Sequence, residues 1–259
     1  MNREEVLREY DEYDRMGRIW GQVSVDRITK ICFPRTSRDT IERYLALPEL
    51  TTTVSDILDR HGIRGAVSAS RLSPLLPGRK IAGNAVTLRS IPERKSPTKG
   101  YIDKAPINMS TRDIYSLAEP GDVFVADFAG DIDTSNFGGQ SGIAAQMHGI
   151  AGAIVYGAVR DASTLRETGY PVWAAGVTPI SGKYRMEAME INGPVRIHDI
   201  VVQSGDLVTA DDSGICVIPA DLVDSVIDEA SKISQKEDKV RSLLKSGASV
   251  STLKTLYRS

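Results

Sequence analysis

Arg160 and Asp161 directly follow an apolar run, Ile150 to Val159, and are the side chains in this sequence best suited to chemistry. Ligands bind beyond the carboxyl ends of strands in α/β sheets. There the carboxylate could ligate a hard cation such as Mg²⁺, and the guanidinium could hold an anion. A solvated turn, with Asp161 capping the helix that "ASTLRETG" predicts, is the simpler explanation of the pair taken alone.

Two further features in the middle of the chain could bind an anion. The stretch Gly138–Gly142 opens a predicted helix, where unpaired backbone N–H groups and the helix dipole attract a carboxylate. Lys183 is a cation on the loop after the next strand. Each feature alone has a plain structural explanation, because glycine pairs at helix starts often serve packing or turns and a loop lysine is usually solvated.

The order of elements brings these features together. Residues 122–177 alternate a strand, a helix over Gln140–His148, the strand that ends before Arg160, a short helix ended by Gly169, and another strand. This alternation predicts an α/β core with parallel neighbouring strands. Because the glycine-opened helix directly precedes the strand ending at Arg160, we expect both features at one edge of the sheet.

Helical segments flank this core, followed by a β-rich tail. We expect helices over residues 1–20, 38–47 and 50–62, strands over 194–219, and a long amphipathic helix with a short helical addendum over 222–259. Thr36 or Ser37 is the expected cap of the second helix, and Ser55 or an upstream threonine that of the third. The chain shows no clean linker, so we expect one domain with its core at about 51–220 and helical arms at 1–47 and 222–259.

One long stretch, residues 91–112, carries prolines and many charges and predicts a surface loop. Loops of that length in compact domains are often lids or interface arms. We therefore expect it to influence the specificity of any site that it borders.

The composition excludes several classes of protein. The net charge of the 259-residue chain is −2 and no basic stripe dominates, which argues against nucleic-acid binding. No window approaches the roughly 20 apolar residues of a membrane span, and the charged start resembles no secretory signal. Cys32 and Cys216 have no zinc spacing and are expected as reduced thiols in a cytoplasmic protein.

The spacing of Gly139, twenty intervening residues and then Arg160-Asp161 resembles the signature of the RraA-like family. The segments "TTTVSDILDRHGIRG", "GRKIAGNAVTL", "GDVFVADFAGD", "AGAIVYGAVRDASTLRETGYPVWAAGVTP" and "GDLVTADDSGICVIP" are similar to family segments in family order, from about Thr51 to Ala220. The family includes divalent-metal pyruvate aldolases acting on 4-hydroxy-4-methyl-2-oxoglutarate and 4-carboxy-4-hydroxy-2-oxoadipate. The resemblance implies a swivelling β/β/α sandwich, here with helical extensions at both ends.

The resemblance also implies roles for individual residues. Asp161 would ligate Mg²⁺ or Mn²⁺, and Arg160 would hold the keto oxygen of a 2-oxo acid and offset the charge of its enolate. The substrate carboxylate would lie on the backbone of Gly139, Gln140, Ser141 and Gly142, with Lys183 as a further substrate-binding cation. The implied activity is retro-aldol cleavage of a 4-hydroxy-2-oxo acid, decarboxylation of oxaloacetate, or both. Family members resemble trimers or dimers of trimers with sites between subunits.

The sequence departs from the aldolase pattern at Thr164, where the family signature has Asp or Glu. A threonine bonds water but adds no charge, which puts metal affinity or base strength in doubt; Glu167, one helical turn later, could substitute in part. Two other functions remain open. Some RraA-like proteins inhibit the endoribonuclease RNase E without catalysis, although those regulators tend to lack the acid after the arginine. The protein could also be a lyase or decarboxylase for a sugar-derived acid, with the loop at 91–112 changing its specificity.

Other acidic residues are weaker candidates. Asp127 and Asp131 are near the glycine stretch in sequence and could line a pocket, whereas Asp56 and Asp59 more simply solvate a helix face. Asp211-Asp212-Ser213-Gly214 predicts a hairpin turn rather than a metal site.

Overall fold

A computed structural model describes residues 2–247 of the chain. Ten strands form one sheet, whose main path runs β1-β12-β11-β3-β4-β6-β7-β2, with β5 beside β6 and β8 beside β3; β9 and β10 form a separate hairpin. The strands are β1 Ala66–Ser68, β2 Ser73–Pro74, β3 Ile81–Pro92, β4 Val123–Asp127, β5 Ser135–Phe137, β6 Gly152–Val159, β7 Val172–Val177, β8 Met186–Ile191, β9 Val195–Ile197, β10 Ile200–Val202, β11 Leu207–Asp211 and β12 Gly214–Ile218. The helices are α1 Arg3–Arg15, α2 Arg38–Leu45, α3 Leu50–Arg60, α4 Pro97–Ile102, α5 Thr111–Leu117, α6 Gly139–Met147, α7 Ala162–Glu167 and α8 Val223–Lys245.

The long strand β3 belongs to two halves of the sheet. Its first residues, from Ile81 to Asn84, pair antiparallel with β11, whereas Ala85 to Arg89 pair parallel with β4. Strands β4, β6 and β7 continue the parallel half, and β12 and β1 continue the antiparallel half. One core cluster draws side chains from both halves and from the β9–β10 hairpin, so the halves face each other as a sandwich. The predicted α/β class with two sheet layers is confirmed.

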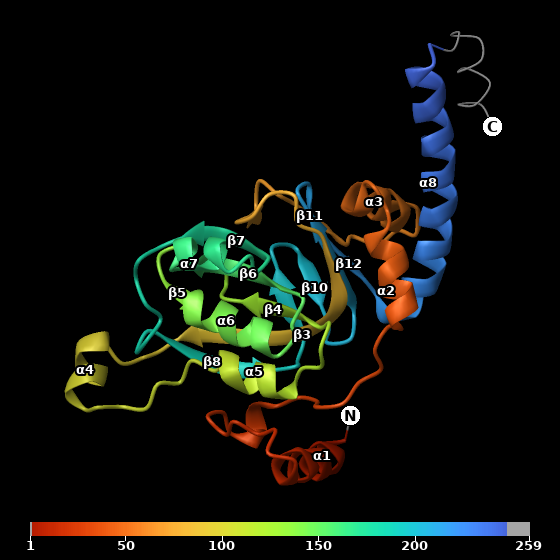
Figure 1. Ribbon diagram of the computed structural model, residues 1–259. Coiled ribbons are helices and arrows are strands. Elements are labelled where there is room, and N and C mark those ends of the chain that lie inside the picture. Colours follow the sequence, from red (N-terminus) through yellow and green to blue (C-terminus); the bar gives the residue numbers. More distant parts are fainter. Residues whose placement is uncertain (1, 248–259) are drawn as a thin grey trace.

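Helices cover the outer face of each half (Figure 1). Ile114 of α5, Ala145 of α6 and Leu165 of α7 are buried in one cluster with side chains of β3, β4 and β6. A second cluster joins α2, α3 and the start of α8 to strands β11 and β12. The parallel strands are therefore covered on both sides, which explains why "AGAIVYGAV" is apolar on both faces.

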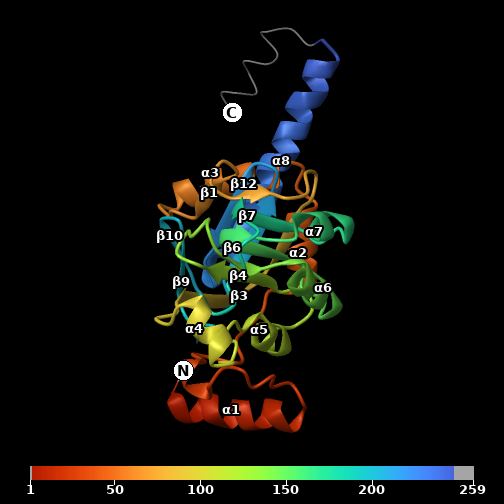
Figure 2. The same cartoon turned by 90° about the vertical axis from the view of Figure 1, so that its left-hand side faces the viewer.

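The two terminal arms differ in how they pack. The first part of the N-terminal arm, residues 3–23, lies along α5, and Val6 and Tyr13 of α1 are buried in the main core. Only the first turns of α8 are buried, at Val223, Val226, Ile227 and Ala230, and the rest of the helix projects from the body (Figure 2). The expected helical addendum over the last residues lies outside the described part of the chain.

One of the two predicted helix caps is present in the structure. Ser37 caps α2 by accepting from the Thr40 N–H, as expected. The cap predicted for α3 is wrong: the helix begins at Leu50 after Glu49, which makes no side-chain cap bond, and Ser55 lies inside the helix. The predicted loop at 91–112 contains a short helix, α4, because Ser96 caps it and Pro97 suits its first position. Between residues 2 and 247, no helix is long and apolar enough to cross a membrane.

Candidate functional site

The carboxyl ends of three neighbouring parallel strands form the site. The backbone N–H of Arg160 donates to the carbonyl oxygen of Phe137 at the end of β5, at 3.0 Å. On the other side, the N–H of Thr178 donates to the carbonyl oxygen of Val159 at 2.9 Å. Arg160 and Asp161 therefore lie between the ends of β5 and β7, at the sheet edge where α/β proteins bind ligands.

The side chain of Asp161 does not cap α7, the helix that it precedes. The residue has a left-handed backbone (φ 52°, ψ 42°) and makes no side-chain cap bond to α7. Its Oδ2 instead accepts from the backbone N–H of Gly139 at 3.2 Å and lies 3.5 Å from Nε of Arg160. The side chains of Arg160 and Asp161 are 42% and 45% exposed. The second carboxylate oxygen of Asp161 has no hydrogen-bond partner within residues 2–247, so it is open to a ligand.

Two glycines allow α6 to begin against this pair. A Cβ at Gly138 would lie 2.8 Å from Oδ2 of Asp161, and one at Gly139 would lie 2.8 Å from Cγ2 of Thr164. Such distances are too short for real side chains, so the close approach requires glycine. The glycine pair is therefore more than a flexible turn, and Thr164 packs on the start of α6.

The start of α6 offers fewer free N–H groups than its sequence predicts. The Gly142 N–H already donates to the carbonyl oxygen of Gly138 at 3.0 Å, and the Gly139 N–H is bonded to Asp161. The N–H groups of Gln140 and Ser141 belong to the first turn of the helix, which has no intrahelical acceptor for them. Of the four predicted positions, these two are the ones open to an anion.

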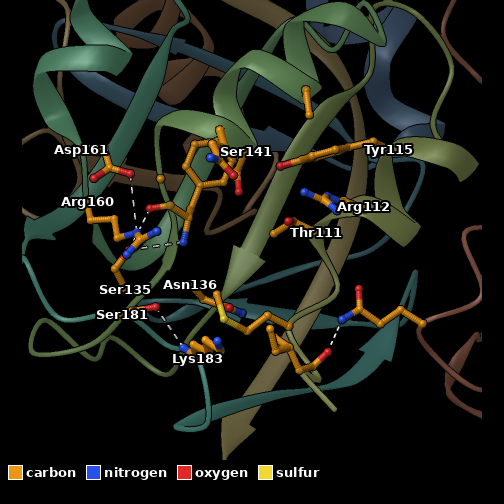
Figure 3. Close-up of a pocket in the computed structure, with 17 residues that line it drawn as sticks. Thr111, Arg112, Tyr115, Ser135, Asn136, Ser141, Arg160, Asp161, Ser181 and Lys183 are labelled. Carbon is orange, nitrogen blue, oxygen red and sulfur yellow. Dashed lines mark hydrogen bonds and ion pairs between the residues drawn. The ribbon is translucent and has the colours of Figure 1, made fainter. Parts of the chain in front are cut away.

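Arg160 and Asp161 open into a cavity of about 370 Å³, within the roughly 300–1,000 Å³ typical of small-molecule sites. Figure 3 shows the pair on one side of the view, Arg112 and Tyr115 on the other, and Lys183 below them. The lining residues come from the N-terminal arm, the loop at 91–112, elements β5, α5 and α6, the end of β6 and the loop after β7: Gln22, Ile107, Met109, Thr111, Arg112, Tyr115, Ser135, Asn136, Phe137, Gly138, Gln140, Ser141, Ala144, Arg160, Asp161, Ser181 and Lys183.

Positive charge dominates the cavity. Arg112, Arg160 and Lys183 line it against the single carboxylate of Asp161. Lys183 is half-buried rather than solvated, and its Nζ lies 5.1 and 5.0 Å from the ring centres of Tyr101 and Tyr184. An acidic ligand would lower the repulsion among these cations.

Two buried side chains in the cavity wall, Asn136 and Tyr115, are not predicted as site residues from the sequence. Asn136 is 1% exposed; its Nδ2 donates to Oγ of Ser90, and its Oδ1 has no partner within the described residues. Tyr115 is also buried, and burial raises the pKa of its hydroxyl. The hydroxyl therefore stays protonated and points toward Ser141 (Figure 3). Neither residue carries a sequence signal, because a tyrosine on a helix is ordinary and nothing local predicts that Asn136 is buried.

The donor set around Asp161 suits a cation that keeps most of its waters. Within residues 2–247, no group of three or more His, Cys, Asp or Glu side chains could enclose a metal. A half-exposed carboxylate with one open oxygen fits Mg²⁺ or Mn²⁺, which need few protein ligands. Glu167 is exposed on α7 and does not line the cavity, so within this chain it does not replace the acid absent at Thr164.

The other acidic candidates lie elsewhere. Asp127 accepts from the N–H groups of Ala129 and Arg196, and Asp131 from those of Asp133 and Thr134, so both organise loops outside the cavity. Asp56 and Asp59 are exposed on α3, as the plain interpretation expects. Asp212 and Ser213 form the two-residue turn between β11 and β12, which confirms the hairpin.

Similar sequences and structures point to one family. The chain is 32% identical over 209 residues to Protein DlpA of Legionella pneumophila, a match that covers 79% of this chain and 32% of DlpA. It is 30% identical over 112 residues to the 4-hydroxy-4-methyl-2-oxoglutarate aldolase of Thermus thermophilus, covering 43% of this chain and 68% of that protein. This chain thus spans about a third of the length of DlpA.

A solved structure shares the fold. RraAS2 of Streptomyces coelicolor, described as an unusual member of the RNase ES inhibitor RraA protein family, aligns with a TM-score of 0.67 at 26% identity. The alignment covers 81% of this chain and 99% of RraAS2. The RraA-like family pattern, described as Aldolase/RraA, matches residues 51–217. The chain therefore belongs to the RraA-like family.

Proposed function

We propose that the protein is a divalent-metal-dependent lyase that breaks a carbon–carbon bond next to a 2-oxo acid. The supporting observation is the meeting of Asp161, Arg160 and the start of α6 in one cavity. Breaking such a bond leaves an enolate, so the site must hold positive charge where that negative charge develops. The aldolase name of the Thermus thermophilus relative agrees with this proposal.

Each residue has a part in the proposed reaction. The N–H groups of Gln140 and Ser141 bind the carboxylate of the 2-oxo acid at the helix start. The Arg160 guanidinium lies beside the keto oxygen and offsets the charge of the forming enolate. Asp161 would hold Mg²⁺ or Mn²⁺, which supplies Lewis-acid polarisation of the same oxo acid when bound.

Oxaloacetate offers the simplest test, because its decarboxylation yields pyruvate through the same enolate. We expect the protein with Mg²⁺ to release pyruvate, measured by coupling to lactate dehydrogenase, and EDTA to stop the release. A screen of 4-hydroxy-2-oxo acids in the same assay would identify the retro-aldol substrate. A rate for every compound equal to that of Mg²⁺ without protein would contradict the lyase proposal.

A protein-binding role is the second candidate, supported by the similarity to RraAS2 at 26% identity. In that case the chain would bind an endoribonuclease of the RNase E type without turning over oxo acids. Asp161 favours the lyase, since a protein-binding surface has no need of a half-exposed carboxylate inside a cationic cavity. Inhibition of such a ribonuclease by the wild-type protein, together with a wild-type lyase rate equal to that of Mg²⁺ alone, would support the second candidate instead.

A further inference from the structure

The N-terminal arm is fixed against α5 beside the cavity. Oδ1 of the buried Asp113 accepts from the backbone N–H groups of Gln22 and Val23, at 3.0 and 3.2 Å. Arg18 bonds the other end of α5 through the carbonyl oxygens of Ser116 and Ala118, at 3.1 and 2.8 Å. These bonds hold residues 18–23 in place, although this segment precedes the family region at 51–217.

This arm positions one cation of the cavity. The guanidinium of Arg112, on the first turn of α5, lies 5.1 Å from the ring centre of Trp20. The Gln22 side-chain amide donates to the carbonyl oxygen of Ile107, so the arm also closes the cavity wall beside Arg112. The described residues 2–247 give Arg112 no acidic partner, whereas Arg160 already lies beside Asp161. Arg112 therefore lines the cavity as an exposed cation whose charge no acidic side chain within residues 2–247 offsets.

The cavity has more positive charge than one carboxylate can satisfy. In the proposed function, the 2-oxo acid end of the substrate occupies Arg160, Asp161 and the start of α6. Arg112 is on the opposite side of the view in Figure 3 and remains for another group. A planar guanidinium suits a carboxylate, which it can bind through two parallel hydrogen bonds.

We propose that Arg112, positioned by the indole of Trp20, binds a second carboxylate at the far end of the substrate. The N-terminal arm then selects dicarboxylic 2-oxo acids over those with an uncharged tail. This inference rests on the proposed function, because it assumes that the oxo-acid end binds beside Arg160 and Asp161. Arg112 is a specificity-determining residue, and Trp20 is a positioning residue that acts through it.

The test compares two five-carbon ligands that differ only at the far end. 2-Oxoglutarate ends in a carboxylate and 2-oxopentanoate in a methyl group, and neither has the 4-hydroxyl group that retro-aldol cleavage requires. Calorimetry with the full chain and saturating Mg²⁺ gives both dissociation constants. We expect the wild-type protein to prefer 2-oxoglutarate, and Arg112→Met to lower that preference about 10- to 100-fold, as for a lost charge-assisted hydrogen bond.

Matched variants separate specificity from general effects. Arg38 is an exposed arginine in the first turn of α2 that does not line the cavity, so Arg38→Met should leave both constants unchanged. Trp20→Leu should lower the preference about 2- to 5-fold, as for a lost exposed cation–π contact, and Trp20→Tyr should restore it. Arg112→Gln provides a second, polar replacement if Arg112→Met folds poorly.

The outcomes distinguish the two proposals. Equal binding of the two ligands by the wild-type protein would overturn the inference, as would a preference that survives Arg112→Met. Loss of the preference in Lys183→Met alone would assign the second carboxylate to Lys183 instead. If neither ligand nor pyruvate binds, the oxo-acid site beside Arg160 is itself wrong, and the proposed function fails together with the inference.

Discussion

Oδ2 of Asp161 lies 3.2 Å from the backbone nitrogen of Gly139, so one carboxylate joins the end of β6 to the start of α6. The remaining oxygen accepts no hydrogen bond from residues 2–247, and the side chain is 45% exposed. The Asp161 carboxylate thus has a structural bond and an open coordination position at once, and its two roles can be separated by substitution.

Asp161→Asn separates these roles. Asparagine keeps an oxygen for the Gly139 N–H and tolerates the left-handed backbone at this position, but it has no charge to hold a divalent cation. We expect lyase activity to fall by about 100-fold or more, with a melting temperature close to that of the wild-type protein. Wild-type activity in Asp161→Asn would remove the metal role of this residue.

Arg160→Lys tests the shape of the cation beside the enolate. Lysine keeps the positive charge but offers a point charge in place of a planar fork. We expect kcat with oxaloacetate to fall roughly 100- to 1,000-fold, similar to the loss of one oxyanion donor. Unchanged turnover would show that Arg160 serves only to terminate β6, where its backbone N–H bonds Phe137.

The sequence predicts the location of the site better than its walls. The apolar run before Arg160 and the glycine pair after β5 have strong local signals, because a buried parallel strand and a helix start each need particular residues. The β-α-β order also predicts that the end of β6 and the start of α6 lie close together. The same reasoning misses Asn136 and Tyr115, whose positions depend on packing between distant segments.

The N-terminal arm shows a second limit of the sequence. Its charged pattern predicts a helix, which α1 confirms, but nothing local predicts that Asp113 bonds the N–H groups of Gln22 and Val23 across 91 and 90 residues. From the sequence alone, Asp161 is also a reasonable cap for α7, but the structure has no such bond. The left-handed backbone instead turns that side chain toward Gly139.

Asp113 predicts a pH dependence of stability. Burial raises the pKa of this carboxyl, so the folded state disfavours its ionised form. A raised carboxyl pKa means that the folded state binds the proton more tightly, and stability falls as pH rises from the unfolded pKa to the folded pKa. Asp113→Asn removes this penalty and keeps an oxygen for the N–H groups of Gln22 and Val23.

We therefore expect Asp113→Asn to melt at a higher temperature than the wild-type protein at pH 7. The difference should shrink as the pH falls through the ordinary aspartate pKa of 3.8, because below that pKa the wild-type side chain becomes neutral in the unfolded state as well as in the folded state. Melting curves across this pH range provide the measurement. A constant difference, or a less stable variant at neutral pH, would contradict the assigned penalty.

Three exposed apolar side chains beside the site predict that the protein associates with copies of itself. Ile132, Val177 and Ile180 are 57%, 55% and 44% exposed near the carboxyl end of β7. We expect a homotrimer or a dimer of trimers, as the family resemblance implies, and dissociation on Val177→Lys. Light scattering coupled to size-exclusion chromatography measures the mass. Val201→Lys on β10 is the control, and a monomeric wild-type protein would contradict sites shared between subunits.

Exchange of the methyl protons of pyruvate tests the central proposal without knowledge of the natural substrate. An enolate-stabilising site must catalyse this exchange in D₂O, which proton NMR follows as loss of the methyl signal. We predict that the protein with Mg²⁺ accelerates the loss well above Mg²⁺ alone, and that Asp161→Asn abolishes the acceleration. A wild-type rate equal to that of Mg²⁺ alone would contradict the enolate site at Arg160 and Asp161.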